Sequence, residues 1–230
     1  MEYLLLIFAY ISLFVSLFWL HILFYLPDRR CKSSFLPSVS IVITALNAEK
    51  TLERTLRSVF DLNYPRQLLE IIVVNNGSTD RTAEIVRSFP SAVYLELAIR
   101  GKASALNFGL RHASGDFFAC LHADSFVKRD ALQKVVKFFH DEHVGGVICA
   151  IKVDQPRTFM EKLQHFEYLL SVLVRTLLAR IHALFITPGV LSVYRTEVIR
   201  NLGGFDEDNL TEDFEMALGL HANHYDVHIE

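Results

Sequence analysis

The fold is decided by the stretch Leu69-Glu70-Ile71-Ile72-Val73-Val74-Asn75-Asn76-Gly77-Ser78-Thr79-Asp80. Its first half is of strand length and apolar except for Glu70, and its second half is polar and contains a glycine. An unbroken apolar run is typical of a parallel strand that helices cover on both faces. The stretch therefore predicts a buried strand, a turn and the start of a helix. Ligands of open parallel sheets bind beyond the carboxyl ends of the strands, so residues 75–80 are a candidate site.

The same alternation of strand-length and helix-length segments continues through the rest of the chain. It predicts an α/β fold with a mostly parallel, Rossmann-like sheet flanked by helices. The helix expected at 158–185 has one apolar face and two arginines, so we expect an interfacial or packed helix rather than a second membrane crossing. The other segments are strands at 39–44, 69–75, 93–97, 117–121, 144–151, 190–194 and 226–229, and helices at 48–60, 80–89, 102–111, 129–140, 196–201 and 212–221.

The first segment differs in kind, because residues 3–26 carry no formal charge. A run of this length is enough to cross a hydrocarbon core, which takes about 20 helical residues. A cleaved signal peptide is the alternative, but the chain start has no basic region and no small-residue cleavage site follows the apolar run. We therefore expect a transmembrane anchor at 1–27, a linker at 28–37 and one domain at 38–230.

The charges beside this segment predict its orientation. Arg29, Arg30 and Lys32 follow the apolar run directly, and positively charged residues flank membrane helices on the cytoplasmic side. We expect a single-pass protein of the cell membrane, in contact with membrane lipid, whose catalytic domain is cytoplasmic.

Composition argues against other classes. The net charge of -3 gives no basic excess with which to neutralise phosphates, so nucleic acid is not an expected partner. The cysteines, Cys31, Cys120 and Cys149, lack the spacing of a zinc site or a disulfide framework, which fits a reducing compartment.

Polar groups at three expected loop positions are candidates for chemistry. The run 75–80 offers amides and a helix start to a nucleotide, although a turn glycine and a helix cap explain the same residues. His122 and Asp124 have the spacing to ligate a cation, although a loop aspartate is often only a cap. Glu212 and Asp213 open a helix whose dipole alone would favour carboxylates, and either could also take a proton from a hydroxyl. At this level both interpretations of each segment stay open.

The order of these segments carries a resemblance. The chain has Pro37 to Asn47, Val73 to Asp80, Gly101 to Asn107, Leu121 to Ser125, Pro188-Gly189 and Gly203 to Phe214 in succession. This succession resembles family 2 glycosyltransferases, and most closely the membrane-integrated branch with chitin, cellulose, hyaluronan and poly-N-acetylglucosamine synthases. The resemblance implies a GT-A fold, with a nucleotide-binding part at about 38–125 and an acceptor part at about 126–230.

The resemblance also implies roles for individual residues in an inverting transfer from a nucleotide-diphosphate sugar. Asp213 would be the general base, with Glu212 beside it in the catalytic group. Asp124, with His122, would hold a divalent cation on the diphosphate, whose charge the cation offsets. The implied donor and substrate contacts are Thr44, Ala45, Asn47, Asn75, Asn76, Lys102, Asn107 and Ala123.

Three features depart from the family pattern. Asn75 stands where the family usually has an aspartate, which leaves the choice of nucleotide base open. His122 replaces the first carboxylate of an Asp-x-Asp motif, and because imidazole suits transition metals, we expect Mn²⁺ to be favoured over Mg²⁺. The Gln-x-x-Arg-Trp motif and later membrane helices are not in this sequence, so we expect the family pattern to be incomplete at Glu230.

The sequence predicts a glycosyltransferase that moves a sugar, expected from a UDP-sugar, to a glycan or lipid-linked acceptor at the cytoplasmic membrane face. Another membrane subunit could supply helices that this chain does not carry. The alternative is a catalytically silent, membrane-tethered homologue that binds nucleotide sugars or supports an active partner.

Overall fold

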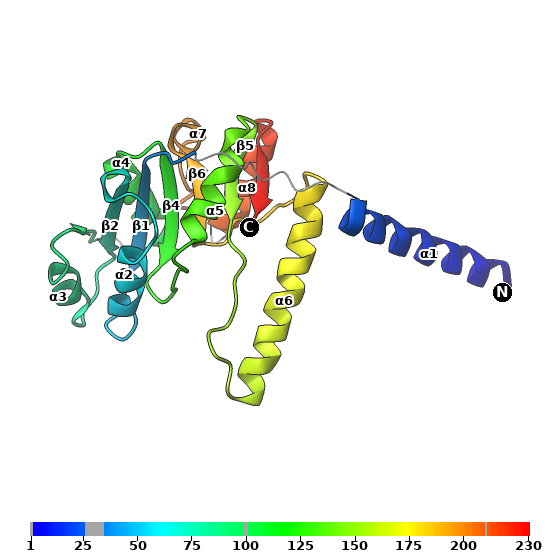
Figure 1. The fold of residues 1–230 in the computed structure, drawn as a ribbon, viewed down its shortest axis with the longest axis horizontal. Helices are drawn as coiled ribbons and strands as arrows, with labels where there is room; N and C mark the ends of the chain where they lie inside the picture. The colour runs from blue at the N-terminus through cyan, green and yellow to red at the C-terminus, as the bar shows by residue number, and fades with distance from the viewer. Residues whose placement is uncertain (1, 26–34, 99–100, 210) are drawn as a thin grey trace.

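A computed structural model describes residues 2–25, 35–98, 101–209 and 211–230. Its centre is a seven-stranded sheet in the order β3-β2-β1-β4-β6-β5-β7 (Figure 1). Every strand except β6 runs in one direction, because β6 pairs antiparallel with both β4 and β5. The strands are β1 (Val39–Ala45), β2 (Leu69–Asn75), β3 (Val93–Glu96), β4 (Phe117–His122), β5 (Val144–Ile148), β6 (Val190–Arg195) and β7 (Asp226–Ile229).

Helices cover both faces of the sheet (Figure 1). Alternation along β1 divides the core, since Ile41 and Ile43 pack on one face and Val42 on the other. The first face is covered by α2 (Leu52–Phe60), α3 (Thr82–Arg87) and α5 (Ala131–Val136). The second face is covered by α4 (Lys102–His112), α7 (Thr196–Asn201) and α8 (Glu212–Ala222). Short 3-10 helices occupy Arg66–Leu68 and Lys137–His140.

Two long helices extend beyond this layered domain. α1 (Glu2–Tyr25) projects away from it, and α6 (Phe159–Arg180) runs down one side (Figure 1). Within the described residues, α1 is the helix long and apolar enough to cross a membrane. α6 starts at a capping box in which Thr158 and Glu161 satisfy each other's backbone N–H groups. Arg180 joins the two helices by donating hydrogen bonds to the carbonyls of Ile22 and Leu23.

The predicted α/β fold is confirmed, with corrections at several element boundaries. The strand expected at 144–151 ends at Ile148, and the helix expected at 158–185 ends at Arg180. The helix expected at 129–140 is α5 followed by a 3-10 turn. The helices expected at 48–60 and 80–89 begin later, at Leu52 and Thr82. The N–H groups of Ala48 and Glu49 donate to the side chains of Thr82 and Asp80, and these bonds hold the two segments before the helices as loops. Residues 28–34 of the expected linker, with Arg29, Arg30, Cys31 and Lys32, lie outside the described residues.

Candidate active site

The sheet register brings the first two candidate segments to one edge. Thr44, near the end of β1, pairs with Val74 of β2 and with His122 of β4. Ala45 pairs with Asn75 at the end of β2. The carboxyl ends of these parallel strands therefore place the predicted nucleotide-binding residues beside the predicted metal ligands.

The loop after β1 and the loop after β2 are tied together by side chains. The side-chain Oδ1 of Asn47 accepts from the Thr79 N–H at 2.9 Å, and the backbone N–H of Asn47 donates to Ser78 Oγ at 2.9 Å. The Glu49 N–H donates to Asp80 at 3.0 Å. Asp80 also accepts from the Thr82 N–H at 3.0 Å, so part of this polar segment supports the start of α3. These hydrogen bonds hold the two loops together at the carboxyl ends of β1 and β2.

The two asparagines at the end of β2 differ in what they leave free. Asn75 is 2% exposed, and its amide donates to Tyr94 Oη at 3.0 Å and accepts from the Ser78 N–H at 3.1 Å. Asn76 donates to the Gly101 carbonyl at 3.0 Å, while its buried Oδ1 has no hydrogen-bond partner among the residues that the structure describes. Within those residues, Asn76 Oδ1 is therefore an acceptor left for a ligand.

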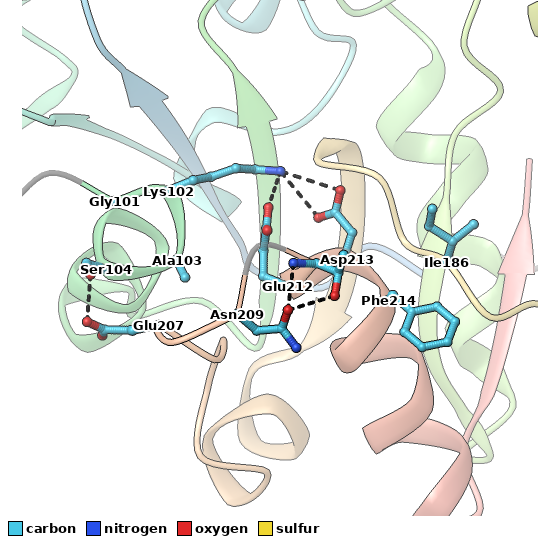
Figure 2. A pocket seen from close by; sticks show the side chains of 11 residues that line it. Gly101, Lys102, Ala103, Ser104, Ile186, Glu207, Asn209, Glu212, Asp213 and Phe214 are labelled. Atoms are coloured by element: carbon cyan, nitrogen blue, oxygen red, sulfur yellow. Dashed lines mark hydrogen bonds and ion pairs between the residues drawn. The ribbon is translucent and has the colours of Figure 1, made fainter.

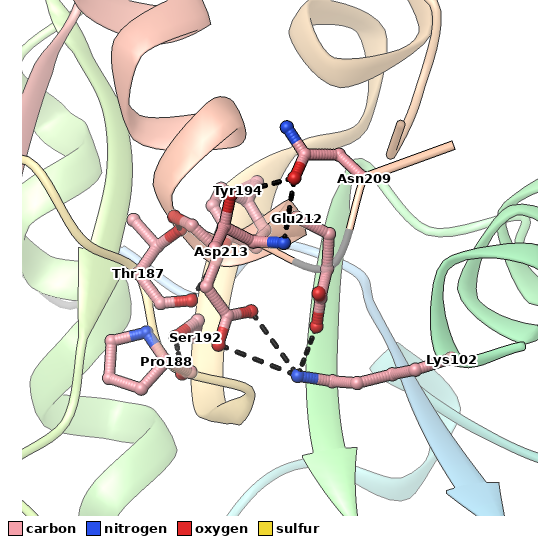
Figure 3. A network of polar contacts seen from close by, with 9 residues as sticks. Lys102, Thr187, Pro188, Ser192, Tyr194, Asn209, Glu212 and Asp213 are labelled. Atoms are coloured by element: carbon pink, nitrogen blue, oxygen red, sulfur yellow. Dashed lines mark hydrogen bonds and ion pairs between the residues drawn. The ribbon is translucent and has the colours of Figure 1, made fainter. Parts of the chain in front are cut away.

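A cluster of charges joins α4 to α8 across the sheet edge. Lys102, at the start of α4, forms an ion pair with Glu212 and lies 3.4 Å from the carboxylate of Asp213 (Figures 2 and 3). Lys102 and Asp213 are 111 positions apart in sequence, and the fold brings their charged groups together. The sequence-based prediction gave Lys102 to the donor contacts and the two carboxylates to the catalytic group; the structure places all three charged groups together.

The cluster shifts the pKa values of its members. Burial raises the pKa of Asp213 above its ordinary value, the charge of Glu212 adds to this, and Lys102 works in the opposite direction. Burial also opposes the charge of Lys102, but hydrogen bonds and charge from Glu212 and Asp213 outweigh it and raise the pKa of Lys102. Lys102 is thus a firmly held cation, and Asp213 is a carboxylate with more affinity for a proton than an exposed aspartate.

The backbone around Asp213 is held from a second loop. Thr187 donates to the Asp213 carbonyl through its N–H at 3.1 Å and through its hydroxyl at 2.8 Å (Figure 3). Tyr194, buried on β6, donates to the Thr187 carbonyl at 3.4 Å. These bonds fix the first turn of α8, whose dipole favours the acidic residues that it carries.

His122 sits beneath the loop that follows Thr187. In the described part of the chain its buried Nε2 has no hydrogen-bond partner, and a Cβ at position 189 would come within 2.4 Å of that atom and 3.4 Å of Lys102 Nζ. Only a glycine lets the backbone pass so close. Burial, and next the charge of Lys102, lower the pKa of His122, so its ring is neutral.

The residues at the end of β4 include two side chains that can ligate a divalent cation. Asp124 is exposed, and His122 has an unshared nitrogen lone pair two residues away. Among the described residues, no group of three or more His, Cys, Asp or Glu side chains forms a complete metal site. A cation here would therefore need further oxygens from a ligand or water. Ala123, between the two, accepts a hydrogen bond from Thr55 at 2.8 Å through its carbonyl and fixes this turn.

A pocket of about 530 Å³ opens beside the charge cluster (Figure 2). Lys102, Glu212 and Asp213 line it, together with side chains that sequence reasoning missed: Ser104, Ile186, Glu207, Asn209, Thr211 and Phe214. Asn107, predicted to contact substrate, instead has its amide engaged by Phe205 and Glu207. It holds in place the loop that carries Glu207 to the pocket. The acidic loop before α8 was the signal that could have pointed to Glu207.

The sheet order, the charge cluster at its edge and the pocket beside it define a GT-A glycosyltransferase domain. The model of glycosyl transferase family 2 matches residues 40–203, and the chain belongs to this family. The chain is similar to poly-beta-1,6-N-acetyl-D-glucosamine synthase of Staphylococcus aureus, at 31% identity over 85% of this chain and 48% of that protein. The same-named protein of Staphylococcus epidermidis is 28% identical over 95% of this chain and 57% of its own length. The chain thus spans about half the length of the curated relatives it matches.

Solved structures agree on the fold. The mannosyltransferase PcManGT from Pyrobaculum calidifontis, in complex with GDP-Man and Mn²⁺, superposes with a TM-score of 0.77 at 29% identity. The match covers 94% of this chain and 61% of that one. S. aureus TarS, in complex with UDP-GlcNAc, has a TM-score of 0.65 at 20% identity, over 84% of this chain and 56% of its own. The predicted family and fold are confirmed.

Proposed function

We propose that this chain transfers a sugar from a nucleotide-diphosphate donor to a hydroxyl group, with inversion at the anomeric carbon. The observation that carries the proposal is the convergence of Lys102, Glu212 and Asp213 between the strand ends and the pocket. The strand ends offer a surface for the donor, and the pocket offers one for the acceptor. A partly buried carboxylate between them, that of Asp213, is where a base must be for the transfer.

Asp213 is the proposed base. The acceptor oxygen attacks the anomeric carbon as its proton passes to Asp213, and the bond from that carbon to the diphosphate oxygen breaks with its electron pair on the diphosphate. The pKa of Asp213 is raised, so its carboxylate binds a proton more readily than that of an exposed aspartate, as a general base requires. Glu212 neutralises Lys102 and leaves Asp213 the less tightly paired of the two carboxylates.

Lys102 is the proposed contact to the donor. Its side chain is 33% exposed and lines the pocket, next to the strand ends. A positive charge there lowers the energy of the negative charge that develops on the departing diphosphate. The proposed nucleoside contacts are Thr44, Ala45, Asn47, Asn75 and Asn76; of the two asparagines after β2, Asn76 has the free acceptor oxygen.

Asp124 and His122 are the proposed holders of a divalent cation. A bound cation would supply Lewis-acid stabilisation of the diphosphate leaving group. The neutral ring of His122 and its unpartnered Nε2 support a preference for Mn²⁺ over Mg²⁺. The PcManGT structure with Mn²⁺ is consistent with a cation in this type of site.

The proposed donor is a UDP-sugar, in keeping with relatives named for N-acetylglucosamine polymers. The proposed acceptor is a glycan or a lipid-linked acceptor, because Phe214 gives the pocket an aromatic wall that packs edge-to-face on exposed Phe185, with ring centroids 6.0 Å apart. We also propose that α1 anchors the chain in the cell membrane with the catalytic domain on the cytoplasmic side.

Titration calorimetry of the full chain in nanodiscs tests the donor site. UDP and GDP are titrated in Mn²⁺, in Mg²⁺ and in EDTA. The proposal predicts UDP binding that Mn²⁺ strengthens more than Mg²⁺ does. Binding of GDP alone would reverse the assignment of the base, and a folded sample that binds neither nucleotide would contradict the donor site.

A second candidate function is a silent nucleotide-sugar-binding subunit. It is favoured by Asn75, whose amide already donates to Tyr94 and accepts from Ser78 and carries no charge, and by the nitrogen ligand at 122. This alternative predicts nucleotide binding without any sugar transfer by the purified chain, with or without the acceptor. Under this alternative, the wild-type chain and Asp213→Asn both show no sugar transfer.

A further inference from the structure

Glu207 lines the pocket beside the charge cluster, and it differs from the other two carboxylates there. Glu212 forms an ion pair with Lys102, and Asp213 lies 3.4 Å from the same ammonium. Within the described residues Glu207 forms no ion pair, although Arg111 on α4 is near enough for the two charges to interact. In that part of the chain, Glu207 is therefore the pocket carboxylate without a cation bound to it.

Two hydrogen bonds from α4 hold the Glu207 carboxylate. Ser104 Oγ donates to Oε2 at 2.6 Å, and Asn107 Nδ2 donates to Oε1 at 2.8 Å (Figure 2). Asn107 is itself fixed, since its amide donates to the Phe205 carbonyl at 2.8 Å and accepts from the Phe205 N–H at 2.8 Å. Holding a long side chain in one place in advance lowers the entropy that it loses when it binds a ligand. Glu207 is thus an exposed carboxylate in a prearranged position.

The same two bonds leave half of the accepting capacity of the carboxylate unused. An ionised carboxylate accepts about four hydrogen bonds on its two oxygens and donates none. Asn107 and Ser104 use one position on each oxygen, so each oxygen keeps another. The hydrogen bond from Asn107, and next that from Ser104, lower the pKa of Glu207, which keeps the carboxylate ionised. A ligand that satisfies both oxygens must bring two donors side by side.

The other side of the pocket supplies an apolar surface. Figure 2 shows Ile186 and Phe214 on the side away from Glu207, with Asn209 between them. The amide of Asn209 is engaged, because it donates to Glu215 and its oxygen accepts from the next loop residues. A sugar ring has apolar C–H faces and hydroxyl groups around its edge. An aromatic wall opposite a fixed pair of acceptors suits such a ring.

We propose that Glu207 is a specificity-determining residue of the acceptor pocket, whose carboxylate accepts hydrogen bonds from two neighbouring hydroxyl groups of the acceptor sugar. The proposal rests on the proposed function, because it takes the pocket as the acceptor side of the transfer. It names the acceptor as a sugar with a free pair of adjacent hydroxyls. In an N-acetylhexosamine, whose carbon 2 carries the acetamido group, these are the hydroxyls on carbons 3 and 4.

Ligand-observed NMR of the full chain in nanodiscs tests the proposal through binding. The probes are the methyl β-glycoside of N-acetylglucosamine, its 4-deoxy analogue, which lacks the hydroxyl pair, and its 6-deoxy analogue, which keeps it. Each is titrated into the wild type, Glu207→Gln and Asp208→Asn. Asp208→Asn is the matched control, because it removes the same charge from the same exposed loop at a residue that does not line the pocket.

In the wild type we expect the dissociation constant of the 4-deoxy compound to exceed that of the parent by about 3- to 10-fold, the range for one hydrogen bond. Glu207→Gln should bring this ratio to about one, since an amide has a single acceptor oxygen, which Ser104 or Asn107 engages. Asp208→Asn should keep the wild-type ratio. The ratio for the 6-deoxy compound should be the same in all three proteins.

A wild-type chain that binds the parent and the 4-deoxy compound equally, or binds neither, would overturn the proposal. So would an equal 4-deoxy ratio in the wild type and Glu207→Gln, or a loss in Asp208→Asn as large as that in Glu207→Gln. If Glu207→Gln does not fold, as judged by circular dichroism, Glu207→Ala replaces it with the same expected ratio, and the wild-type ratio needs no variant.

Binding is measured without turnover, so the two proposals can fail separately. A chain that distinguishes the 4-deoxy compound but transfers no sugar would contradict the proposed function and leave this inference standing. A chain that transfers sugar but does not distinguish the 4-deoxy compound would do the reverse.

Discussion

Replacing Gly189 with alanine tests the packing that joins the metal end of the site to the base. The new Cβ would lie 2.4 Å from His122 Nε2, 2.9 Å from its Cδ2 and 3.4 Å from Lys102 Nζ. The imidazole has to move by about 1 Å to restore ordinary contact, and overpacking of this kind costs about 1–3 kcal/mol. For a chain of this size that lowers the melting temperature by about 2–12 °C. We expect transfer activity to fall as well, because Lys102 and His122 shift together.

The matched control is Gly219→Ala in α8. A Cβ there meets only Leu202 Cδ1 at 3.7 Å, an ordinary contact. Because alanine favours a helix over glycine, this change should stabilise the chain by about 0.5–1 kcal/mol. Thermal unfolding of both variants, followed by circular dichroism in the same nanodiscs, gives the comparison.

A double variant identifies the cause of the loss. In an His122→Ala background the atoms that meet the Cβ are gone, so adding Gly189→Ala should cost less than about 0.5 kcal/mol. A Gly189→Ala protein as stable as the wild type would refute the reasoning. So would an equal loss in the His122→Ala background, since the collision would then not be with the imidazole.

Three further predictions concern charge, metal and loop support. Glu212→Gln should move the acidic limb of kcat/KM to lower pH, because the charge of Glu212 helps to raise the pKa of Asp213 and the base then stays ionised in more acidic solution; an unmoved or upward-shifted limb would count against this. His122→Asp should make Mg²⁺ support activity more nearly as well as Mn²⁺ does, measured as the ratio of initial rates, and an unchanged ratio would remove His122 from the cation site. Asn107→Ala leaves the buried Phe205 N–H without its acceptor and should cost about 1–3 kcal/mol in thermal unfolding, whereas no loss would mean that water replaces the amide.

The strands could be predicted because their signal is local. Each of β1, β2 and β4 has an apolar centre, at 41–43, 71–74 and 117–121, as is typical of strands covered on both faces. Helix starts were less accurate, because they depend on partners far along the chain. Ala48 donates to Thr82 Oγ1 at 2.9 Å, a contact that no local pattern at 48–60 reveals, and the helix begins only at Leu52.

Part of the candidate site could be predicted from local sequence, and part could not. The motifs singled out Asp124, just after a strand, and Lys102 and Asp213, at helix starts, because charged residues at the ends of elements are visible in the sequence itself. The space beside Gly189 and the loop support by Asn107 depend on contacts between distant segments, so residue types alone did not predict them. The exposure of the apolar side chains of α6 also needed the structure, since their periodicity predicts a stripe but does not say which side the domain occupies.

Sugar transfer by Asp213→Asn, compared with the wild type, tests the central claim most directly. Asparagine keeps the shape of the side chain but cannot take the acceptor proton. With a labelled UDP-sugar and a glycan acceptor, transfer should fall by about 10²- to 10⁴-fold while UDP affinity in calorimetry stays close to that of the wild type. An Asp213→Asn protein that transfers sugar at the wild-type rate would contradict the account.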